Sequence, residues 1–151
     1  MPLLVAALAP RMLELAGRLA DGTITYWADE KAIAEHVVPR IGAAAAAAQR
    51  PAPRVVVGVP VAVTHDVEGA RRRAARLFAS YEGIPTYQRI LGRGQSLDPV
   101  DVAVIGTGAD VRNRLRRFED AGATDLCASV LGLDDDRDGS RFRTLDALAS
   151  L

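Results

Sequence analysis

The stretch VAALAPRMLELAGRLADGTITYW, residues 5–27, decides the fold of this chain. An apolar run without polar alternation, from Leu3 to Leu8, is typical of a strand that is covered on both faces. Pro10 suits the first turn of a helix, and apolar residues then recur at helical spacing from Met12 to Leu19. Residues 23–27 are β-branched and aromatic, which favours a second strand. A complete strand-helix-strand unit is therefore predicted almost immediately after Met1.

The same alternation continues along the chain. Four main strands are expected over residues 3–8, 23–27, 55–63 and 126–131, with helices over about 10–19, 30–50, 66–81, 86–91, 108–120 and 140–151. Pro60 cannot donate to a strand ladder, so it indicates a bulge or a frayed end in the third strand. Asp29 is placed to cap the second helix. Strands separated by helices predict parallel βαβ units with right-handed crossovers.

Composition restricts the class of protein. The 151 residues are enough for one domain but short of the ~250 of a complete (β/α)8 barrel. Lys plus Arg equals Asp plus Glu at 19 each, so net charge does not support a nucleic-acid or anionic-membrane partner. A single cysteine excludes an intrachain disulfide framework. The sequence shows neither a membrane span nor a signal peptide, so we expect a cytoplasmic protein.

Most chemical motifs favour structural roles. DDDRDG, residues 134–139, resembles the start of a calcium loop, but Leu145 stands where a bidentate Glu is needed, so a solvated acidic loop that caps the last helix is expected. Cys127 lies in an apolar strand and is expected to be a small buried residue. The start of the first helix offers free backbone N–H groups, beside which Arg11 could add positive charge. No catalytic residue can be assigned, and no metal site is expected.

Three blocks of sequence carry a resemblance to a known family. They are LLVAALAPRMLELAGRLADGTITYW (3–27), PRVVVGVPVAVTHDVEGARRRAARLFASY (53–81) and VAVIGTGADVRNRLRRFEDAGATDL (102–126). In this order and at this spacing they resemble the luciferase-like monooxygenase superfamily, in particular members that use coenzyme F420 rather than FMN. The resemblance implies the C-terminal half of a (β/α)8 TIM barrel, with about four parallel strands and outer helices in a single partial domain, residues 1–151. VAVIG would then be an excursion outside the barrel.

The resemblance also implies a cofactor site. In the family, the loop after the fifth strand helps to hold the phosphate-bearing tail of the cofactor, and here that loop corresponds to Leu8, Ala9, Pro10, Arg11 and Met12. Tyr26 and Trp27 would face the pocket mouth at the end of the sixth strand, although packing in the core or rim is the alternative. The family residue at Ala9 is more commonly glycine. The cofactor is expected to be coenzyme F420, with FMN as the alternative.

Three functions remain open at this stage. The first is a fragment of a flavin- or deazaflavin-dependent oxidoreductase that transfers hydride to or from an organic substrate and is inactive alone. The second is a non-catalytic half-barrel that binds or assembles, and the third is an unrelated small α/β protein. An inner sheet face lined by residues such as Val5, Ala7, Val57, Val59 and Val130 would be uncovered. We therefore expect a homodimer, or a complex with an N-terminal half-barrel.

Overall fold

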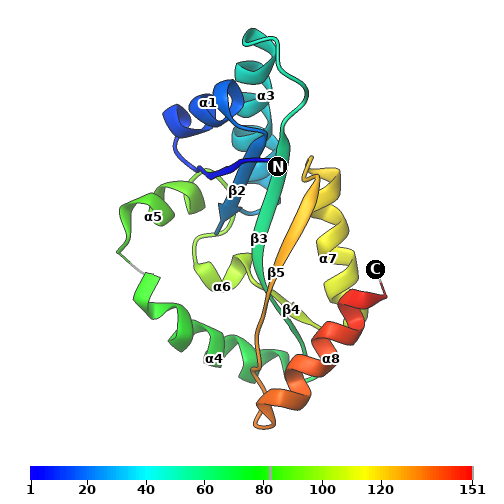
Figure 1. Cartoon of the computed structure of the whole chain (residues 1–151). Helices are drawn as coiled ribbons and strands as arrows, with labels where there is room; N and C mark the ends of the chain where they lie inside the picture. Colours follow the sequence, from blue (N-terminus) through cyan, green and yellow to red (C-terminus); the bar gives the residue numbers. More distant parts are fainter. Residues whose placement is uncertain (82, 151) are drawn as a thin grey trace.

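Alternating strands and helices form one parallel sheet with attached helices in the computed structural model, which describes residues 1–81 and 83–150 (Figure 1). The strands are β1 (Leu4–Ala6), β2 (Gly22–Tyr26), β3 (Arg54–Val63), β4 (Val104–Gly106) and β5 (Asp125–Val130). The main helices are α1 (Pro10–Leu19), α2 (Glu30–Ala32), α3 (Val38–Ala47), α4 (Val67–Phe78), α5 (Pro85–Leu91), α6 (Pro99–Val102), α7 (Gly108–Asp120) and α8 (Arg137–Ala149). A π-helical turn, Ile33–Val37, joins α2 to α3, and a 3-10 turn, Ala79–Tyr81, follows α4.

The sheet has the predicted sequential order of its four main strands. β1 pairs with β2, β2 with β3, and β3 with β5, all in parallel. The segment expected to lie outside the barrel behaves differently, because β4 joins the sheet as a fifth strand and pairs with the end of β3 through Val61–Val63. VAVIG is therefore an extension of the sheet, which corrects the prediction of an excursion.

Pro60 lies inside a continuous strand, so the expected bulge or frayed end is wrong. Pro60 is paired with Ser129 of β5. β2 pairs with β3 only as far as Gly58, and β4 begins to pair at Val61 on the same edge. The missing N–H of Pro60 points into the gap between β2 and β4, where no ladder bond is lost.

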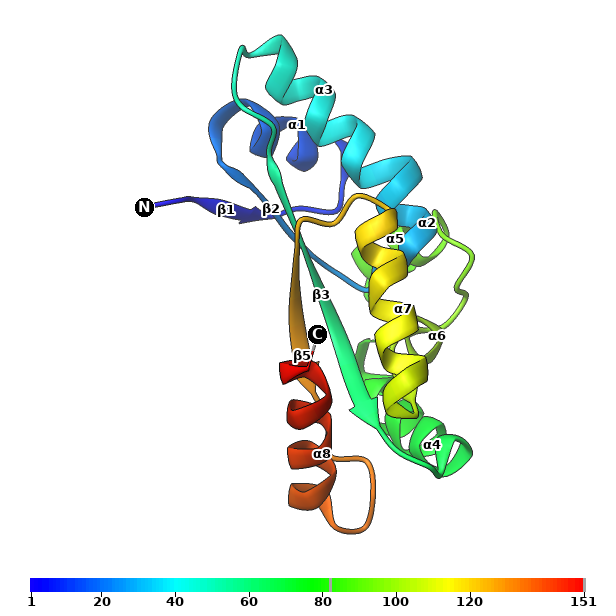
Figure 2. The same ribbon diagram turned by 90° about the vertical axis from the view of Figure 1, so that its right-hand side faces the viewer.

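The helices that cover the sheet lie on one of its faces, as predicted, whereas the start of α5 reaches the other face beside Tyr26. Figure 2 views the sheet close to edge-on, with α2, α4, α6 and α7 on one side of β3. The central strand β3 is buried along nearly its whole length, and contacts with α7 and α8 add to those with its neighbouring strands. The opposite face of the sheet is left open by the part of the chain that the structure describes.

The residues expected on the open face point the other way. Val57 and Val59 are fully buried in the core beneath the helices, and Val5 and Val130 share their side of the sheet by register. Ala7, just after the end of β1, is also buried in the core. The open face carries the residues between them. They are Ala6, Ile24, Tyr26, Gly58, Cys127 and Ser129. Because β3 is apolar at odd and even positions alike, its sequence does not define which set faces the helices.

Candidate functional site

The open face of the sheet contains a cavity of about 730 Å³, a volume typical of sites for small organic ligands. The cavity is lined by the end of β1 and the loop after it, by β2, β3 and β5, and by the start of α5. Its lining residues are Ala6, Ala7, Leu8, Ala9, Met12, Ile24, Thr25, Tyr26, Gly58, Ile84, Thr86, Tyr87, Cys127 and Ser129. The surface is mainly apolar, with the hydroxyl groups of a few Tyr, Ser and Thr residues.

Tyr26 is the aromatic wall of this cavity. A Cβ atom added at Gly58 would lie 2.9 Å from the ring atom Cδ2 of Tyr26 and 2.6 Å from the carbonyl oxygen of Thr25. Gly58 therefore leaves the room that the Tyr26 ring occupies against the central strand. Burial raises the pKa of the Tyr26 phenol, and the hydroxyl of Ser129 opposes this shift only in part. At neutral pH the phenol keeps its hydrogen and can donate it to a ligand.

Trp27 lies behind Tyr26 rather than beside it. Its side chain is fully buried, and its ring meets those of Tyr26, Phe78 and Tyr81 edge-on at centroid distances of 4.7, 4.7 and 5.5 Å. A backbone φ of 60° turns the chain away from the cavity at this residue. Trp27 thus supports the wall from the core, in agreement with the alternative of core packing.

The loop between β1 and α1 forms one end of the cavity. Leu8, Ala9 and Met12 line it, whereas the exposed side chain of Arg11 is not among the lining residues. Ala9 is the N-cap of α1 and gives no side-chain hydrogen bond. Because Pro10 has no N–H and Leu13 donates to Ala9, the N–H groups of Arg11 and Met12 remain available in the first turn.

His36 is hydrogen-bonded to the backbone of this loop. Its Nε2 lies 2.8 Å from the carbonyl oxygen of Leu8, and Nε of Arg40 lies 3.2 Å from its Nδ1. A carbonyl only accepts, so Nε2 carries the hydrogen and Nδ1 accepts from Arg40. Burial lowers the pKa of His36, and the positive charges of Arg93 and Arg40 add to this effect against the hydrogen bond to Leu8. A neutral imidazole therefore holds the loop at pH 7.

Cys127 is exposed, so the expectation of a small buried residue is wrong. Its register with Gly58 places it on the open face, while its neighbours Leu126 and Ala128 pack against the core. Among residues 1–81 and 83–150, the cavity lining therefore offers a thiol and several hydroxyls, but no carboxylate or imidazole. These groups can bind and orient a ligand, whereas a group that exchanges protons near pH 7 would have to come from elsewhere.

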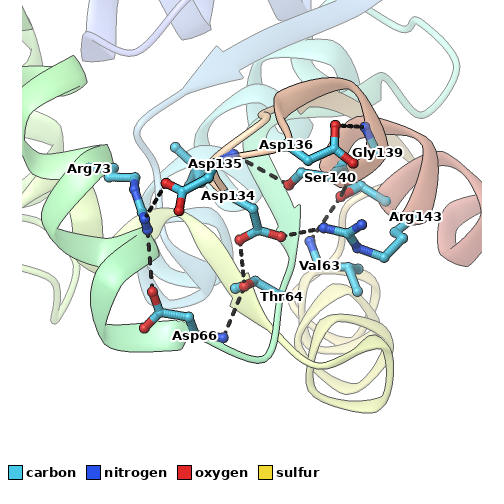
Figure 3. A network of polar contacts seen from close by, with 12 residues as sticks. Val63, Thr64, Asp66, Arg73, Asp134, Asp135, Asp136, Gly139, Ser140 and Arg143 are labelled. Atoms are coloured by element: carbon cyan, nitrogen blue, oxygen red, sulfur yellow. Dashed lines mark hydrogen bonds and ion pairs between the residues drawn. The ribbon is translucent and has the colours of Figure 1, made fainter.

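The acidic loop after β5 is a second polar cluster, at the ends of β3 and β5 (Figure 3). Asp134 accepts from Oγ1 of Thr64 at 2.8 Å and pairs with Arg143, while Arg73 bridges Asp66 at 3.3 Å and Asp135 at 3.1 Å. Asp136 caps α8 through the N–H of Gly139, as predicted for this loop. The carboxylates are matched by cations, so the cluster ties the β3–α4 turn to α8.

Within residues 1–81 and 83–150, no group of three or more His, Cys, Asp or Glu side chains is arranged to hold a metal ion. In the same residues, no helix is both long and apolar enough to cross a membrane.

Comparison with solved structures relates the chain to enzymes of about twice its length. It matches the coenzyme F420-dependent tetrahydromethanopterin reductase of Methanopyrus kandleri with a TM-score of 0.67 at 18% identity, covering 93% of this chain and 48% of that one. For an F420-dependent secondary alcohol dehydrogenase in complex with an F420-acetone adduct, the TM-score is 0.69 at 20% identity, with 98% and 49% covered.

A third match is the FMN complex of the oxygenating constituent of 3,6-diketocamphane monooxygenase from Pseudomonas putida. Its TM-score is 0.64 at 18% identity, with 96% of this chain and 45% of that one covered. The chain thus spans just under half the length of these three structures. No curated protein matches the sequence.

The sequential parallel sheet with helices on one face, and a cavity on the other, defines half of a (β/α)8 barrel of the luciferase-like type. The family model for luciferase-like monooxygenases matches residues 1–125. The chain belongs to the luciferase-like monooxygenase family.

Proposed function

We propose that this chain is the cofactor-binding half of a luciferase-like oxidoreductase that uses coenzyme F420, with FMN as the alternative. The observation that carries this proposal is the apolar cavity on the open sheet face, which brings Leu8, Ala9, Met12 and Tyr26 together. Its size and lining fit the planar ring system of a flavin or deazaflavin. The structurally similar enzymes include two that are named as F420-dependent and one bound to FMN.

Each part of the site has a proposed role. The cofactor ring lies in the cavity against Tyr26, whose protonated phenol donates a hydrogen bond to it, and Trp27 holds Tyr26 in place from the core. The tail phosphate is bound by the first turn of α1, residues 8–12, with backbone N–H groups and the charge of Arg11. When bound, the cofactor exchanges a hydride with an organic substrate. The chain alone has no turnover, because hydride transfer needs the cofactor ring and the substrate held at near-contact distance, and the open face of the sheet supplies only one wall of such a site.

We also propose that a second half-barrel completes the structure. β1 and β5 are edge strands, and the helix that follows each of them exposes apolar residues. On α1 these are Met12, Leu15 and Leu19, and on α8 they are Phe142 and Leu145. Open edges and apolar patches favour association. The second half is an N-terminal half-barrel or a second copy of this chain. Residues 1–151 are then a single partial barrel domain. We place the protein in the reducing cytoplasm, which suits the exposed thiol of Cys127.

Equilibrium dialysis with coenzyme F420 and with FMN tests the cofactor. We expect weak, saturable binding to the wild type and at least a tenfold loss in Tyr26→Ala, because the aromatic wall is removed. Tyr81→Phe is the matched control, since Tyr81 is an aromatic residue outside the cavity lining. Equal binding by Tyr26→Ala and the wild type would contradict the proposed ring site, and cofactor oxidation by the chain alone would contradict its inactivity.

Sedimentation velocity tests association. We expect the wild type to form dimers, and Leu19→Glu and Phe142→Glu to shift it toward the monomer because each places a charge in an apolar patch. Arg116→Gln, at an exposed position on α7, serves as the control. A monomeric wild type that binds no apolar dye would refute an associating surface.

A further inference from the structure

Another large cavity lies beyond the carboxyl end of the sheet, between α4, the loop after β5 and the start of α8. Its volume is about 680 Å³. These elements lie together at the end of the molecule toward which β3 and β5 run (Figure 1). Among the residues that the structure describes, none lines both this cavity and the open-face cavity that contains Tyr26. A cavity of this size takes a small organic molecule.

Leu131 connects this cavity to the open face of the sheet. Cys127 and Ser129 line the open-face cavity. The N–H of Leu131 still donates to the carbonyl oxygen of Val61 at 2.9 Å, so the strand geometry continues as far as Leu131. Because alternate residues of a strand share a face, Leu131 follows Ser129 on the open face, about 7 Å further along. A ligand that covers Leu131 can therefore extend along the sheet into the open-face cavity.

Three leucines make part of the lining apolar. Leu131 is half-buried and Leu133 is buried, whereas Leu77 of α4 is 53% exposed. The loop that carries Leu131 and Leu133 is held to α8, because the N–H of Leu133 donates to Oγ of Ser140 at 3.3 Å. An apolar ligand in the cavity would remove the side chain of Leu77 from water, which favours binding.

Arginines on two sides of the cavity supply positive charge. The two carboxylates in the described lining, those of Asp134 and Asp135, each pair with an arginine, as Figure 3 shows. Arg76 of α4 and Arg137 of α8 also line the cavity, and neither forms an ion pair with any of residues 1–81 and 83–150. Their guanidinium groups are therefore available to an anion in the cavity.

Arg141 is the third such group. Its partner is Asp138, one turn earlier in α8, at 3.6 Å, and both side chains are exposed. An exposed pair of this kind is weak, so Arg141 can turn to another anion. The remaining carboxylate at the start of α8, that of Asp136, accepts the N–H of Gly139 at 3.0 Å. Neither Asp136 nor Asp138 belongs to the described lining of the cavity.

We propose that this cavity binds the carboxylate end of an organic substrate, whose apolar body covers the leucines and whose reacting end lies in the open-face cavity. Arg76 holds the carboxylate from α4, and Arg137 and Arg141 hold it from α8. Guanidinium groups suit this role because they donate two parallel hydrogen bonds to a carboxylate. The assignment of this ligand as the substrate rests on the proposed function, whereas the binding of an apolar carboxylate rests on the cavity and its arginines alone.

The midpoint of thermal unfolding tests the carboxylate site without any flavin. Sodium hexanoate is the probe, with hexan-1-ol and with sodium chloride of equal ionic strength as comparisons. Hexanoate should raise the midpoint of the wild type, and its apparent affinity should fall about tenfold in Arg76→Gln/Arg137→Gln. Arg18→Gln/Arg116→Gln is the matched control, since it removes the same charge at two exposed positions away from the cavity. Equal affinity in the two double variants, an absent shift in the wild type, or an equal shift with hexan-1-ol overturns the site.

Equilibrium dialysis with FMN, in the presence and absence of hexanoate, tests where the carboxylate lies relative to the proposed ring site. Both ligands should bind at once with an unchanged FMN affinity, because the two cavities have separate described linings. Displacement of FMN by hexanoate overturns the placement of the carboxylate beyond the ring. If the hexanoate shift follows the arginines while no flavin binds, the carboxylate site stands and the proposed flavin function fails.

Discussion

Replacing Asp29 with Ala tests how the loop that carries Arg93 is held. The carboxylate of Asp29 is 2% exposed and accepts from the N–H groups of Ala32, Gln95 and Ser96 at 2.9, 2.7 and 2.8 Å. A buried donor left without an acceptor costs about 1–3 kcal/mol. Two of these three donors, those of Ala32 and Ser96, belong to buried residues, while that of Gln95 belongs to an exposed residue.

We therefore expect Asp29→Ala to lower the free energy of unfolding by about 3 kcal/mol, since two buried donors lose a charged acceptor at about 1.5 kcal/mol each. At about 3 °C per kcal/mol for a chain of this size, the melting temperature should fall by about 9 °C. Urea unfolding followed by circular dichroism at pH 7 gives the free energy, and calorimetry gives the melting temperature.

Asp136→Ala is the matched control. Asp136 is also a helix N-cap, but it is exposed and accepts only the N–H of Gly139 at 3.0 Å. Its loss should cost about 1 kcal/mol. If Asp29→Ala costs no more than Asp136→Ala, the reasoning that one buried carboxylate joins two segments is refuted.

Four further outcomes are expected. Gly58→Ala should weaken flavin binding at least fivefold in equilibrium dialysis, because the added methyl displaces the Tyr26 ring; unchanged binding would show that the ring does not depend on Gly58. Cys127 should react rapidly with a maleimide, and FMN should slow this reaction if both occupy the same cavity. His36 has a pKa below its usual 6.5, so the unfolded chain binds more protons and stability should fall as the pH drops below about 6.5; the pH–stability curve of His36→Asn should be flatter there. The pKa of Asp29 is also lowered, because burial, which would raise it, is outweighed by the hydrogen bonds from Ala32, Gln95 and Ser96. Wild-type stability should therefore fall further below pH 4, and this loss should be smaller in Asp29→Asn.

The strand and helix order could be predicted from the sequence because each element has its own local signal. Proline opens α1 and Asp29 caps α2, as expected, and a capping box of Thr107 and Asp110 opens α7. These signals depend on hydrogen bonds within a few residues, which is why they survive in the folded chain.

The direction of the side chains in β3 could not be predicted in the same way. RVVVGVPVAV is apolar at every position after Arg54, so its hydrophobicity is the same on both faces. Other residues indicate which face of β3 lines the cavity. Gly58 interrupts the run of valines in β3, and Tyr26, Cys127 and Ser129 on the neighbouring strands lie on the same face as Gly58. Small and polar residues in register across three strands were the signal for the cavity.

The sequence also did not predict a small cavity, of about 100 Å³, in which Arg89 and Arg93 lie beside Leu8, Ala9 and Pro10. Arg89 and Arg93 lie in the Gly- and Pro-rich segment after residue 81, and nothing local places that segment beside the start of α1, about 80 residues earlier in the chain. Their position depends on the long-range hydrogen bonds of Asp29 to Gln95 and Ser96. Such contacts have no short-range pattern in the sequence.

The position of Trp27 gives the protein an internal optical reporter. It is the only tryptophan in the chain, its side chain is fully buried, and none of residues 1–81 and 83–150 accepts a hydrogen bond from its Nε1. Its fluorescence therefore originates from one buried position, where the indole packs against the ring of Tyr26, which lines the cavity. Oxidised flavins absorb where tryptophan emits, so a bound ring at this distance would quench the emission by energy transfer. Occupancy of the site can thus be read in the unlabelled protein, from a residue that does not itself contact the ligand.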